Sequence, residues 1–389
     1  MRDVGLVGKP FAGKSTLFTA LTRSGSAGGQ ANVAVVPVPD ARLDVLTEIE
    51  RSKKTVPAQV RFVDVPGGTS SAQGVAKLRE VDALAIVVRC FGPDAKPAAE
   101  LRDVEADLVL ADLAVIEPAL EKAEKRAKGK ANDETAALAR AKDALAAETP
   151  LRDAGLAEED LVHLRGIAPL TLKPVVVVAN LEEGATVPAD LPAGTVGVSA
   201  AIEAETAEME PEEARALLEE FGVIERGLPR VISACYRALD LITFLTTGED
   251  ETRAWEVRRG AKAPEAAGAI HSDLERGFIR AEVIGYDQLV EDGSMDAAKA
   301  KGHLRMEGKE YVVAEGDILQ GRFAVCARVR GFASDAPRRS RTRSSGSSGS
   351  SGSPSSDSRS SASSPRHRGR AGERSSHPPW RARRSGSRS

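Results

Sequence analysis

Cysteine is scarce in this sequence of 389 residues. The three cysteines, Cys90, Cys235 and Cys326, are far apart and odd in number, which excludes a disulfide framework. None belongs to a C-x-x-C pair, and His271 and His303 stand apart from any Cys or acid at ligand spacing, so no zinc site is indicated. We expect the cysteines to be small buried apolar side chains, or incidental in the case of Cys326, and the histidines to serve packing.

Long hydrophobic runs are absent as well. Apolar runs such as residues 83–88 and 175–179 have the length of a strand, far below the roughly 20 residues that cross a bilayer as a helix. The chain opens directly on a strand-like run, without the basic and then apolar pattern of a secretory leader. We therefore expect a soluble, cytoplasmic protein without a membrane partner.

A net positive charge is absent from most of the chain and is found only at its end. Residues 326–389 contain fifteen Arg, no Lys and three acids, about +12, so with an overall charge of −3 the first 325 residues carry about −15. Ser, Arg, Gly and Pro dominate this tail, and it has too little to bury to fold, so we expect disorder. Two interpretations stay open: an arm that contacts RNA or other phosphates, or GC-rich DNA translated in the wrong frame.

A phosphate-binding motif lies near the start of the chain. An apolar run at residues 4–7 precedes a complete G-x-x-x-x-G-K-S, and helical spacing follows at residues 16–22. Such a loop between strand and helix wraps backbone N–H groups around phosphates. We expect Lys14 to reach the β- and γ-phosphates and the Ser15 hydroxyl to bind Mg²⁺. The predicted nucleotide-binding residues here are Gly8, Lys9, Pro10, Phe11, Ala12, Gly13, Lys14, Ser15 and Thr16.

A D-x-x-G motif follows about fifty residues later, with Asp64 at the end of a strand-like run and Gly67 three residues on. Here the Asp64 carboxylate can hold Mg²⁺ in its second shell while the Gly67 N–H faces a γ-phosphate. The next residue, Gly68, has no side chain to orient an attacking water. We therefore predict slow intrinsic hydrolysis, with Lys14 and Gly67 as the catalytic groups.

A third motif predicts which base is bound. Asn180 and Glu183 occupy the places of N and D in the N-K-x-D motif of GTPases, and Leu181 replaces its Lys. An aspartate that accepts two guanine hydrogen bonds has no purpose opposite adenine, and unpaired buried groups are costly. We therefore predict ATP over GTP. Ser199 and Ala200, after the last strand, are predicted to complete the base-binding loop.

Strands that alternate with helices predict an α/β fold with a parallel sheet. We expect a P-loop G domain over residues 1–100 and 166–237, an inserted helical hairpin over 101–165, a small α+β domain over 238–325 and the tail 326–389. Residues 59–64 alternate like an antiparallel or edge strand. In the α+β domain we expect short strands, residues 311–313 among them, and one helix.

With these motifs assembled, the chain resembles the YchF-type Obg-like ATPases, a branch of the translation-factor P-loop GTPases. The resemblance runs from Arg2 to Val325. It implies a G domain with an inserted coiled-coil arm, a C-terminal TGS domain of β-grasp type, ATP hydrolysis and a cytoplasmic ribosome partner. The ribosome contact, with the large subunit or between subunits, would use the arm and the TGS domain. Besides the phosphate loop and N-x-x-E, it rests on residues 32–40, 62–64, 88–91, 111–113, 241–244, 253–255, 270–273, 277–283 and 308–313.

The chain departs from this family at three places. Phe11 stands where the phosphate loop usually has an Asn that helps to seat a monovalent cation, and residues 28–31 lack the Thr that usually binds Mg²⁺. The second switch shrinks to residues 67–74. Our first hypothesis is a ribosome-associated, Mg-dependent ATPase. A GTPase of the same superfamily and a nucleotide-binding ribosome adaptor with little hydrolysis are the alternatives.

Overall fold

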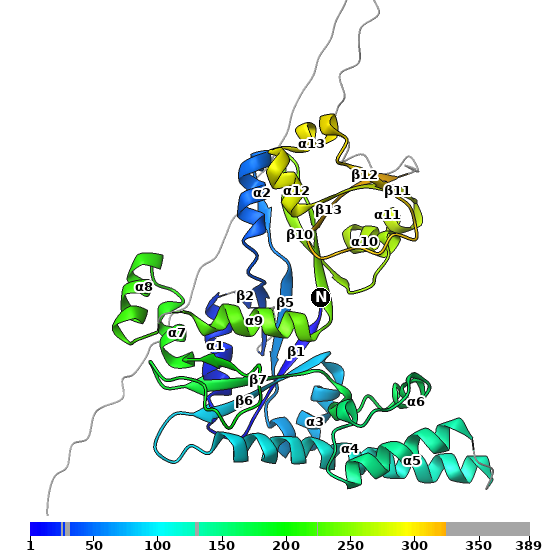
Figure 1. The fold of residues 1–389 in the computed structure, drawn as a ribbon. Helices are drawn as coiled ribbons and strands as arrows, with labels where there is room; N and C mark the ends of the chain where they lie inside the picture. The colour runs from blue at the N-terminus through cyan, green and yellow to red at the C-terminus, as the bar shows by residue number, and fades with distance from the viewer. Residues whose placement is uncertain (25, 28–31, 129–131, 224, 324–389) are drawn as a thin grey trace, which may run out of the picture. The chain divides into compact units, whose positions relative to one another are not determined.

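The computed structural model describes residues 1–24, 26–27, 32–128, 132–223 and 225–323 (Figure 1). Seven strands form the first sheet in the order β2-β3-β5-β1-β6-β7-β8. Strands β5, β1, β6, β7 and β8 are parallel neighbours, whereas β3 is antiparallel to β5 and to β2. The bounds are β1 Asp3–Val7, β2 Ser26–Ala27, β3 Val33–Pro37, β5 Gln59–Asp64, β6 Ala83–Cys90, β7 Val175–Leu181 and β8 Val196–Val198.

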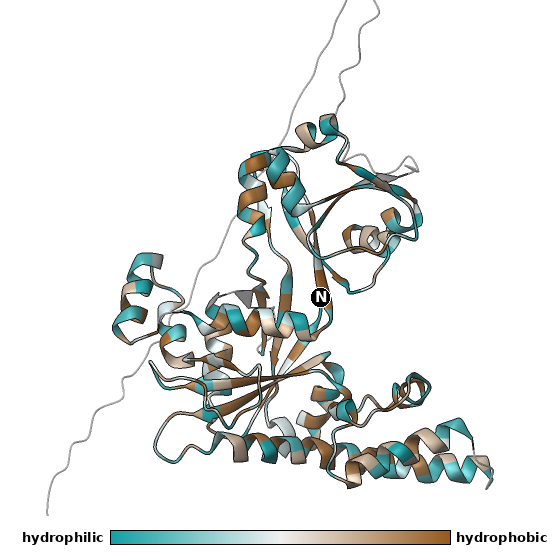
Figure 2. Ribbon diagram, in the orientation of Figure 1, coloured by the Kyte–Doolittle hydropathy of each residue, from teal (hydrophilic) through white to brown (hydrophobic). Residues whose placement is uncertain are grey.

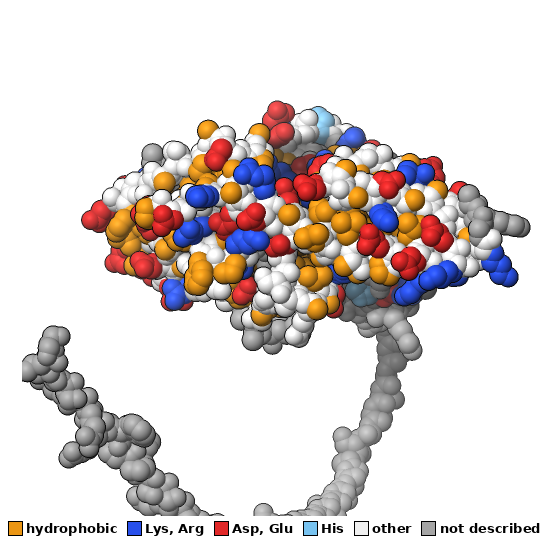
Figure 3. Space-filling model, turned by 90° about the horizontal axis from the view of Figure 1, so that it is seen from below, with side chains coloured by type: hydrophobic (Ala, Val, Ile, Leu, Met, Phe, Trp, Pro, Cys, Tyr) orange, Lys and Arg blue, Asp and Glu red, His pale blue; other side chains and the backbone are white. Residues whose placement is uncertain are grey.

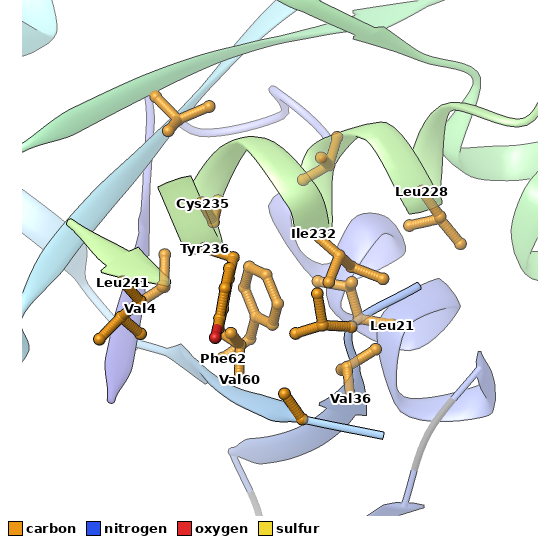
Figure 4. Packing of buried hydrophobic residues seen from close by; sticks show 14 of the residues in the cluster. Val4, Leu21, Val36, Val60, Phe62, Leu228, Ile232, Cys235, Tyr236 and Leu241 are labelled. Atoms are coloured by element: carbon orange, nitrogen blue, oxygen red, sulfur yellow. The ribbon is translucent and has the colours of Figure 1, made fainter. Parts of the chain in front are cut away.

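Helices cover both faces of this sheet, as its buried strands require. Figure 2 shows β1, β6 and β7 as largely hydrophobic. One core joins the sheet to α1 (Lys14–Ser24), α7 (Ala200–Thr206) and α9 (Gly227–Ala238), and Figure 4 labels ten of its side chains. The other core joins the opposite face to α3 (Ala72–Glu80) and the first turns of α4 (Pro97–Ala127). The remaining helices of this half are α2 (Arg42–Glu50) and α8 (Pro211–Glu220).

The predicted helical hairpin is confirmed. It consists of α4 and α5 (Asp133–Ala146), which pack along each other, with α6 (Glu158–Leu164) against α5 (Figure 1). Ile116, Leu120 and Leu138 belong to the core that holds these helices together. Asn132 caps α5 by accepting a hydrogen bond from the Thr135 N–H at 2.8 Å. Acidic and basic side chains are interspersed on the face seen in Figure 3, so this face carries no field of a single sign.

A second sheet of six strands has the order β12-β11-β13-β9-β10-β4. Five of its strands follow residue 240, but β4 (Thr55–Val56) comes from the first half of the chain and pairs in parallel with β10. The other bounds are β9 Leu241–Thr246, β10 Thr252–Arg258, β11 Phe278–Gly285, β12 Arg305–Glu307 and β13 Asp317–Phe323. Helices α10 Ala263–Ile270, α11 Ser272–Arg276, α12 Tyr286–Asp292 and α13 Met295–Lys301 accompany them.

Two expectations about secondary structure were wrong, and a third was confirmed in one of its two forms. Residues 311–313 make only one isolated bridge, between Lys262 and Val312, so the strand-favouring Tyr-Val-Val lacks a neighbouring strand there. The domain has four helices where we expected one, because helices of five to eight residues are too short to show a period. Residues 59–64 were expected to form an antiparallel or edge strand, and the antiparallel form is confirmed: β5 is antiparallel to β3 on one side. It is parallel to β1 on the other side, so it is not at an edge.

The expected α/β P-loop fold with a C-terminal domain is therefore present, whereas the domain boundaries stay predictions. Helix α4 begins at Pro97, before the expected start of the arm, and β4 lies in the second sheet. The tail at 326–389 lies outside the described residues. Among the helices that are described, none has an apolar stretch able to cross a lipid bilayer.

Candidate functional site

The phosphate loop connects β1, which ends at Val7, with α1, which begins at Lys14. The Lys14 ammonium lies inside the loop, where Nζ donates to the carbonyl oxygens of Gly8 at 2.8 Å and Lys9 at 2.7 Å. A Cβ on Gly8 would approach the carbonyl oxygen of Val87 to 2.3 Å. Glycine is therefore required there because the loop passes close over strand β6.

Lys14 lies in the field of two carboxylates. Burial lowers its pKa, and the charges of Asp64 and Glu100 oppose that shift. Burial also raises the pKa of Asp64, and the Lys14 charge counteracts it. The predicted phosphate-binding ammonium and the predicted magnesium-binding carboxylate are thus neighbours, which suits a site that takes a polyanion together with a cation.

Glu100, in the first turn of α4, is a carboxylate that the sequence analysis missed. Its Oε2 accepts from the Arg89 N–H at 3.3 Å, while its Oε1 is buried and has no hydrogen-bond partner among the described residues. Burial raises its pKa, and Lys14 and Lys9 act in the opposite direction. A helix that leads into the arm therefore contributes charge to the phosphate site.

Asn180 joins the phosphate loop to the loop after β8. Its Nδ2 donates to the carbonyl oxygen of Ala12 at 3.1 Å, and its Oδ1 accepts from the Ala200 N–H at 3.2 Å. The side chain is only 5% exposed, and a Cβ on Gly13 would lie 2.0 Å from its Nδ2. The amide therefore braces two segments that we expect to contact opposite ends of a nucleotide.

The other residues of the predicted base site are placed differently. The buried Ser199 donates from Oγ to the carbonyl oxygen of Glu182 at 3.4 Å, and Ala200 is fully buried. Glu183 is exposed, and its carboxylate makes no hydrogen bond or ion pair within the described part of the chain. The assigned contacts of Asn180, Ser199, Ala200 and Glu183 with a base stay predictions.

The segment after Asp64 forms a tight turn. Gly67 has φ 77°, and a Cβ there would lie 2.4 Å from Oγ of Ser71. The Gly68 N–H donates to the carbonyl oxygen of Val65 at 3.0 Å, and Ser71 caps α3 by accepting from the Gly74 N–H at 3.0 Å. Glycine is therefore required at 67 because the turn passes close to Ser71 at the start of α3 and has a positive φ.

Phe11 projects from the phosphate loop into solvent. It has φ 66° and is 89% exposed, which is unusual for a bulky aromatic residue. Ser15 and Thr16, at the start of α1, are exposed too. The hydroxyl expected to bind Mg²⁺ is therefore accessible at the mouth of the loop.

Asp112 and Asp107 on α4 also went unpredicted. The fully buried Asp112 receives four hydrogen bonds at 2.8–2.9 Å, from Arg79, Leu170 and Thr171. Asp107 accepts from Lys9 of the phosphate loop at 2.9 Å. An acid on the apolar stripe of a helix is the one sequence signal that could have identified either residue.

The cysteines and histidines serve packing and capping within the described residues. Cys235 is fully buried, which raises its pKa to about 12, and burial raises that of the half-buried Cys90 to about 11. His271 accepts from the Asp273 N–H at 3.1 Å as the cap of α11, and His303 pairs with Asp292 at 2.8 Å. The described residues contain no group of three His, Cys, Asp or Glu side chains that could hold a metal.

Comparison with known proteins identifies both halves of the chain. A family model described as "50S ribosome-binding GTPase" matches residues 3–119, and the YchF-GTPase_C model, described as a protein of unknown function, matches residues 241–324. The latter supports a YchF C-terminal domain, while its TGS character stays a prediction.

Relatives match over nearly their whole length. The "Ribosome-binding ATPase YchF" of Bacillus subtilis (strain 168) is 40% identical over 361 residues, which are 82% of this chain and 99% of the relative. The protein of the same name from Escherichia coli O157:H7 is 38% identical, with the same coverage. The solved structure of the Schizosaccharomyces pombe YchF GTPase superposes with a TM-score of 0.74 at 30% identity, over 82% of this chain and 97% of that one. The chain belongs to the YchF family, as the sequence motifs had predicted.

Proposed function

We propose that this chain is a ribosome-associated nucleoside triphosphatase that binds Mg·ATP and releases ADP and phosphate. The observation that carries the proposal is the geometry of the phosphate loop. Lys14 lies inside the loop on two carbonyl oxygens, with the carboxylate of Asp64 close enough to affect its pKa. A triphosphate that enters this loop would draw the Lys14 ammonium toward its β- and γ-phosphates.

Magnesium fits the residues that are present. Mg²⁺ is usually held by one or two protein oxygens together with the phosphates, not by a full protein cage. The exposed Ser15 hydroxyl can bind it directly, and Asp64 through water. Burial raises the pKa of Asp64, and a cation nearby would favour its ionised form. When bound, Mg²⁺ would neutralise charge that develops on the phosphates.

Hydrolysis would rely on charge neutralisation and positioning. The Gly67 N–H and the Lys14 ammonium would stabilise the charge that develops as water attacks the γ-phosphorus and the bond to the bridging oxygen breaks. Gly68 offers no side chain to orient that water. We therefore expect slow turnover by the isolated protein.

The proposed preference for ATP is supported by the residues at the end of β7 and just after it. Glu183 and Leu181 stand where a guanine site has Asp and Lys, and Glu183 is exposed in the turn that directly follows β7. The braced loop at Ser199 and Ala200 would flank the base. An adenine ring needs no carboxylate to accept two hydrogen bonds, so the substitution favours ATP.

The ribosome is the proposed partner because the relatives reported above are named ribosome-binding ATPases. The arm of α4 and α5 and the C-terminal domain would make the contact, with the large subunit or between subunits, and the basic tail could add contacts to RNA. With this partner, we expect the protein to act in the cytoplasm.

Titration calorimetry with ATP, ADP, GTP and GDP in the presence of Mg²⁺ tests the proposal directly. We expect adenine nucleotides to bind more tightly, and Lys14→Ala to abolish triphosphate binding. Tighter guanine binding would favour the GTPase alternative. Phosphate release is then measured with and without ribosomes. Release in neither condition would favour the alternative of a nucleotide-binding adaptor, which the shortened second switch supports.

A further inference from the structure

Asp107 on α4 connects three parts of the molecule through one oxygen atom. Its Oδ2 accepts a hydrogen bond from Nζ of Lys9, in the phosphate loop, at 2.9 Å. The same oxygen accepts from Oγ1 of Thr69 at 3.0 Å. Thr69 lies in the 3-10 turn Gly68–Ser70, directly after the D-x-x-G segment. A carboxylate of the arm helix therefore holds both segments that we propose to face the γ-phosphate.

The ion pair is not placed to contribute much to stability. The side chains of Lys9 and Asp107 are 31% and 33% exposed, and pairs screened by solvent are worth little. What distinguishes Asp107 is that one oxygen accepts from both segments, so any shift of this carboxylate changes both hydrogen bonds at once. The arrangement specifies a geometry more than it stabilises the fold.

Helix α4 provides a direct path from Asp107 to the distal arm. Leu108, beside Asp107, packs in the core under the first sheet, whereas Ile116 and Leu120 of the same helix pack in the core of the arm. Between them the buried Asp112 ties α4 to Arg79 of α3. The helix continues through Pro118 to Ala127. A displacement of α4 at Asp107 is therefore carried into the arm.

We propose that Asp107 is a positioning residue that couples the phosphate site to the helical arm. This inference rests on the proposed function. A γ-phosphate that attracts Lys9 or reorders the turn at Thr69 changes the bonds to Asp107 and so shifts α4. By reciprocity of binding, a partner that displaces the arm changes the affinity for the triphosphate. Because the same displacement would move Lys9 and Thr69 beside the phosphate site, we also expect it to change the rate of hydrolysis.

Two variants weaken the contacts of Asp107 in different ways, and a third variant is the matched control. Asp107→Asn removes the charge, and Thr69→Val removes only the hydroxyl. If one of these two variants does not fold, the other still tests the proposal. Asp103→Asn changes an exposed carboxylate one turn earlier on α4, which makes no hydrogen bond or ion pair within the described residues. The first measurement is hydrogen exchange of residues 97–127, compared between the protein with ADP and the protein with a non-hydrolysable ATP analogue. The second is the rate of ATP hydrolysis, compared with and without ribosomes.

We expect the wild type and Asp103→Asn to show a nucleotide-dependent difference in exchange along α4, and both link variants to lose it. The ratio of hydrolysis rates with and without ribosomes should fall by about fivefold or more in the link variants. A purely structural role would speed exchange equally with both nucleotides and leave the ratio unchanged, which would overturn the proposal. If both link variants behave like Asp103→Asn while the wild type hydrolyses ATP, the coupling is refuted and the proposed function stands. If the wild type binds no nucleotide, the coupling proposal and the proposed function are both refuted.

Discussion

Replacement of Asn180 by Ala tests whether the amide braces the site or reads the base. The change removes the hydrogen bonds of 3.1 Å to the Ala12 carbonyl and 3.2 Å from the Ala200 N–H. Ala12 and Ala200 are both fully buried, so both backbone groups would be left unpaired. At about 1–3 kcal/mol for each orphaned group, we expect the free energy of unfolding to fall by about 3 kcal/mol.

The effect on nucleotides separates the two roles of Asn180. A brace supports the phosphate loop and the base loop together, so its loss should weaken ATP, ADP, GTP and GDP alike. We expect a loss of about tenfold for each, or about 1.4 kcal/mol. A residue that reads the base would instead change the ratio of ATP to GTP affinity.

The assays are urea denaturation for stability and calorimetric titration for affinity. Asn132→Ala is the matched control, because Asn132 is an exposed helix cap in the arm. It should cost about 1 kcal/mol of stability and leave nucleotide affinity unchanged. An Asn180→Ala protein with wild-type stability, or with an altered preference between adenine and guanine, would refute the bracing role.

Three further predictions concern stability. Asp112→Ala should lower the free energy of unfolding by about 3–5 kcal/mol in urea denaturation, because Arg79 loses a fully buried partner; a loss below 1 kcal/mol would contradict this. Phe11→Gly should raise stability by up to about 1 kcal/mol, since φ 66° is strained for Phe and the ring is exposed; a decrease would show that the ring makes stabilising contacts. Burial raises the pKa of Glu203 above its ordinary value of 4.5, so the folded state keeps this proton to higher pH than the unfolded state. Stability should therefore fall as pH rises from 4.5 through the raised pKa and level off above it. Glu203→Gln should lack this decline in denaturation curves at a series of pH values.

The sequence was informative wherever the signal was local. The apolar run at residues 83–88 had the length of a strand and forms β6, which is parallel to both of its neighbours. The spacing of Gly8 and Gly13 predicted the loop between β1 and α1. In these cases the residues that show the sequence pattern are the same residues that form the predicted element.

The parts that could not be predicted depend on residues distant in sequence. Asn180 was identified by its motif, but its partner Ala12 is 168 residues away. The hydrogen bond between Lys9 and Asp107 joins residues that are 98 positions apart. The periodicity of a sequence does not predict contacts over such a separation. Exposure of Phe11 was equally hidden, because a bulky aromatic is expected inside. Local sequence patterns predict which face of a helix or strand is buried. Which side chains of two different elements meet is known only from the folded structure.

The pairing of β4 with β10 has a consequence for how the protein is made. Ser52, just before β4, hydrogen-bonds Thr252, the first residue of β10, at 2.7 Å across 200 residues of chain. At roughly 5–20 residues per second, a nascent chain would wait about 10–40 s between the emergence of these two partners. During that interval β4 lacks the strand with which it pairs, and in any chain that terminates before β10 its backbone groups stay without that partner. A protein whose relatives are named for binding ribosomes thus cannot complete this part of its amino-terminal half until synthesis has passed the midpoint of the chain and reached β10.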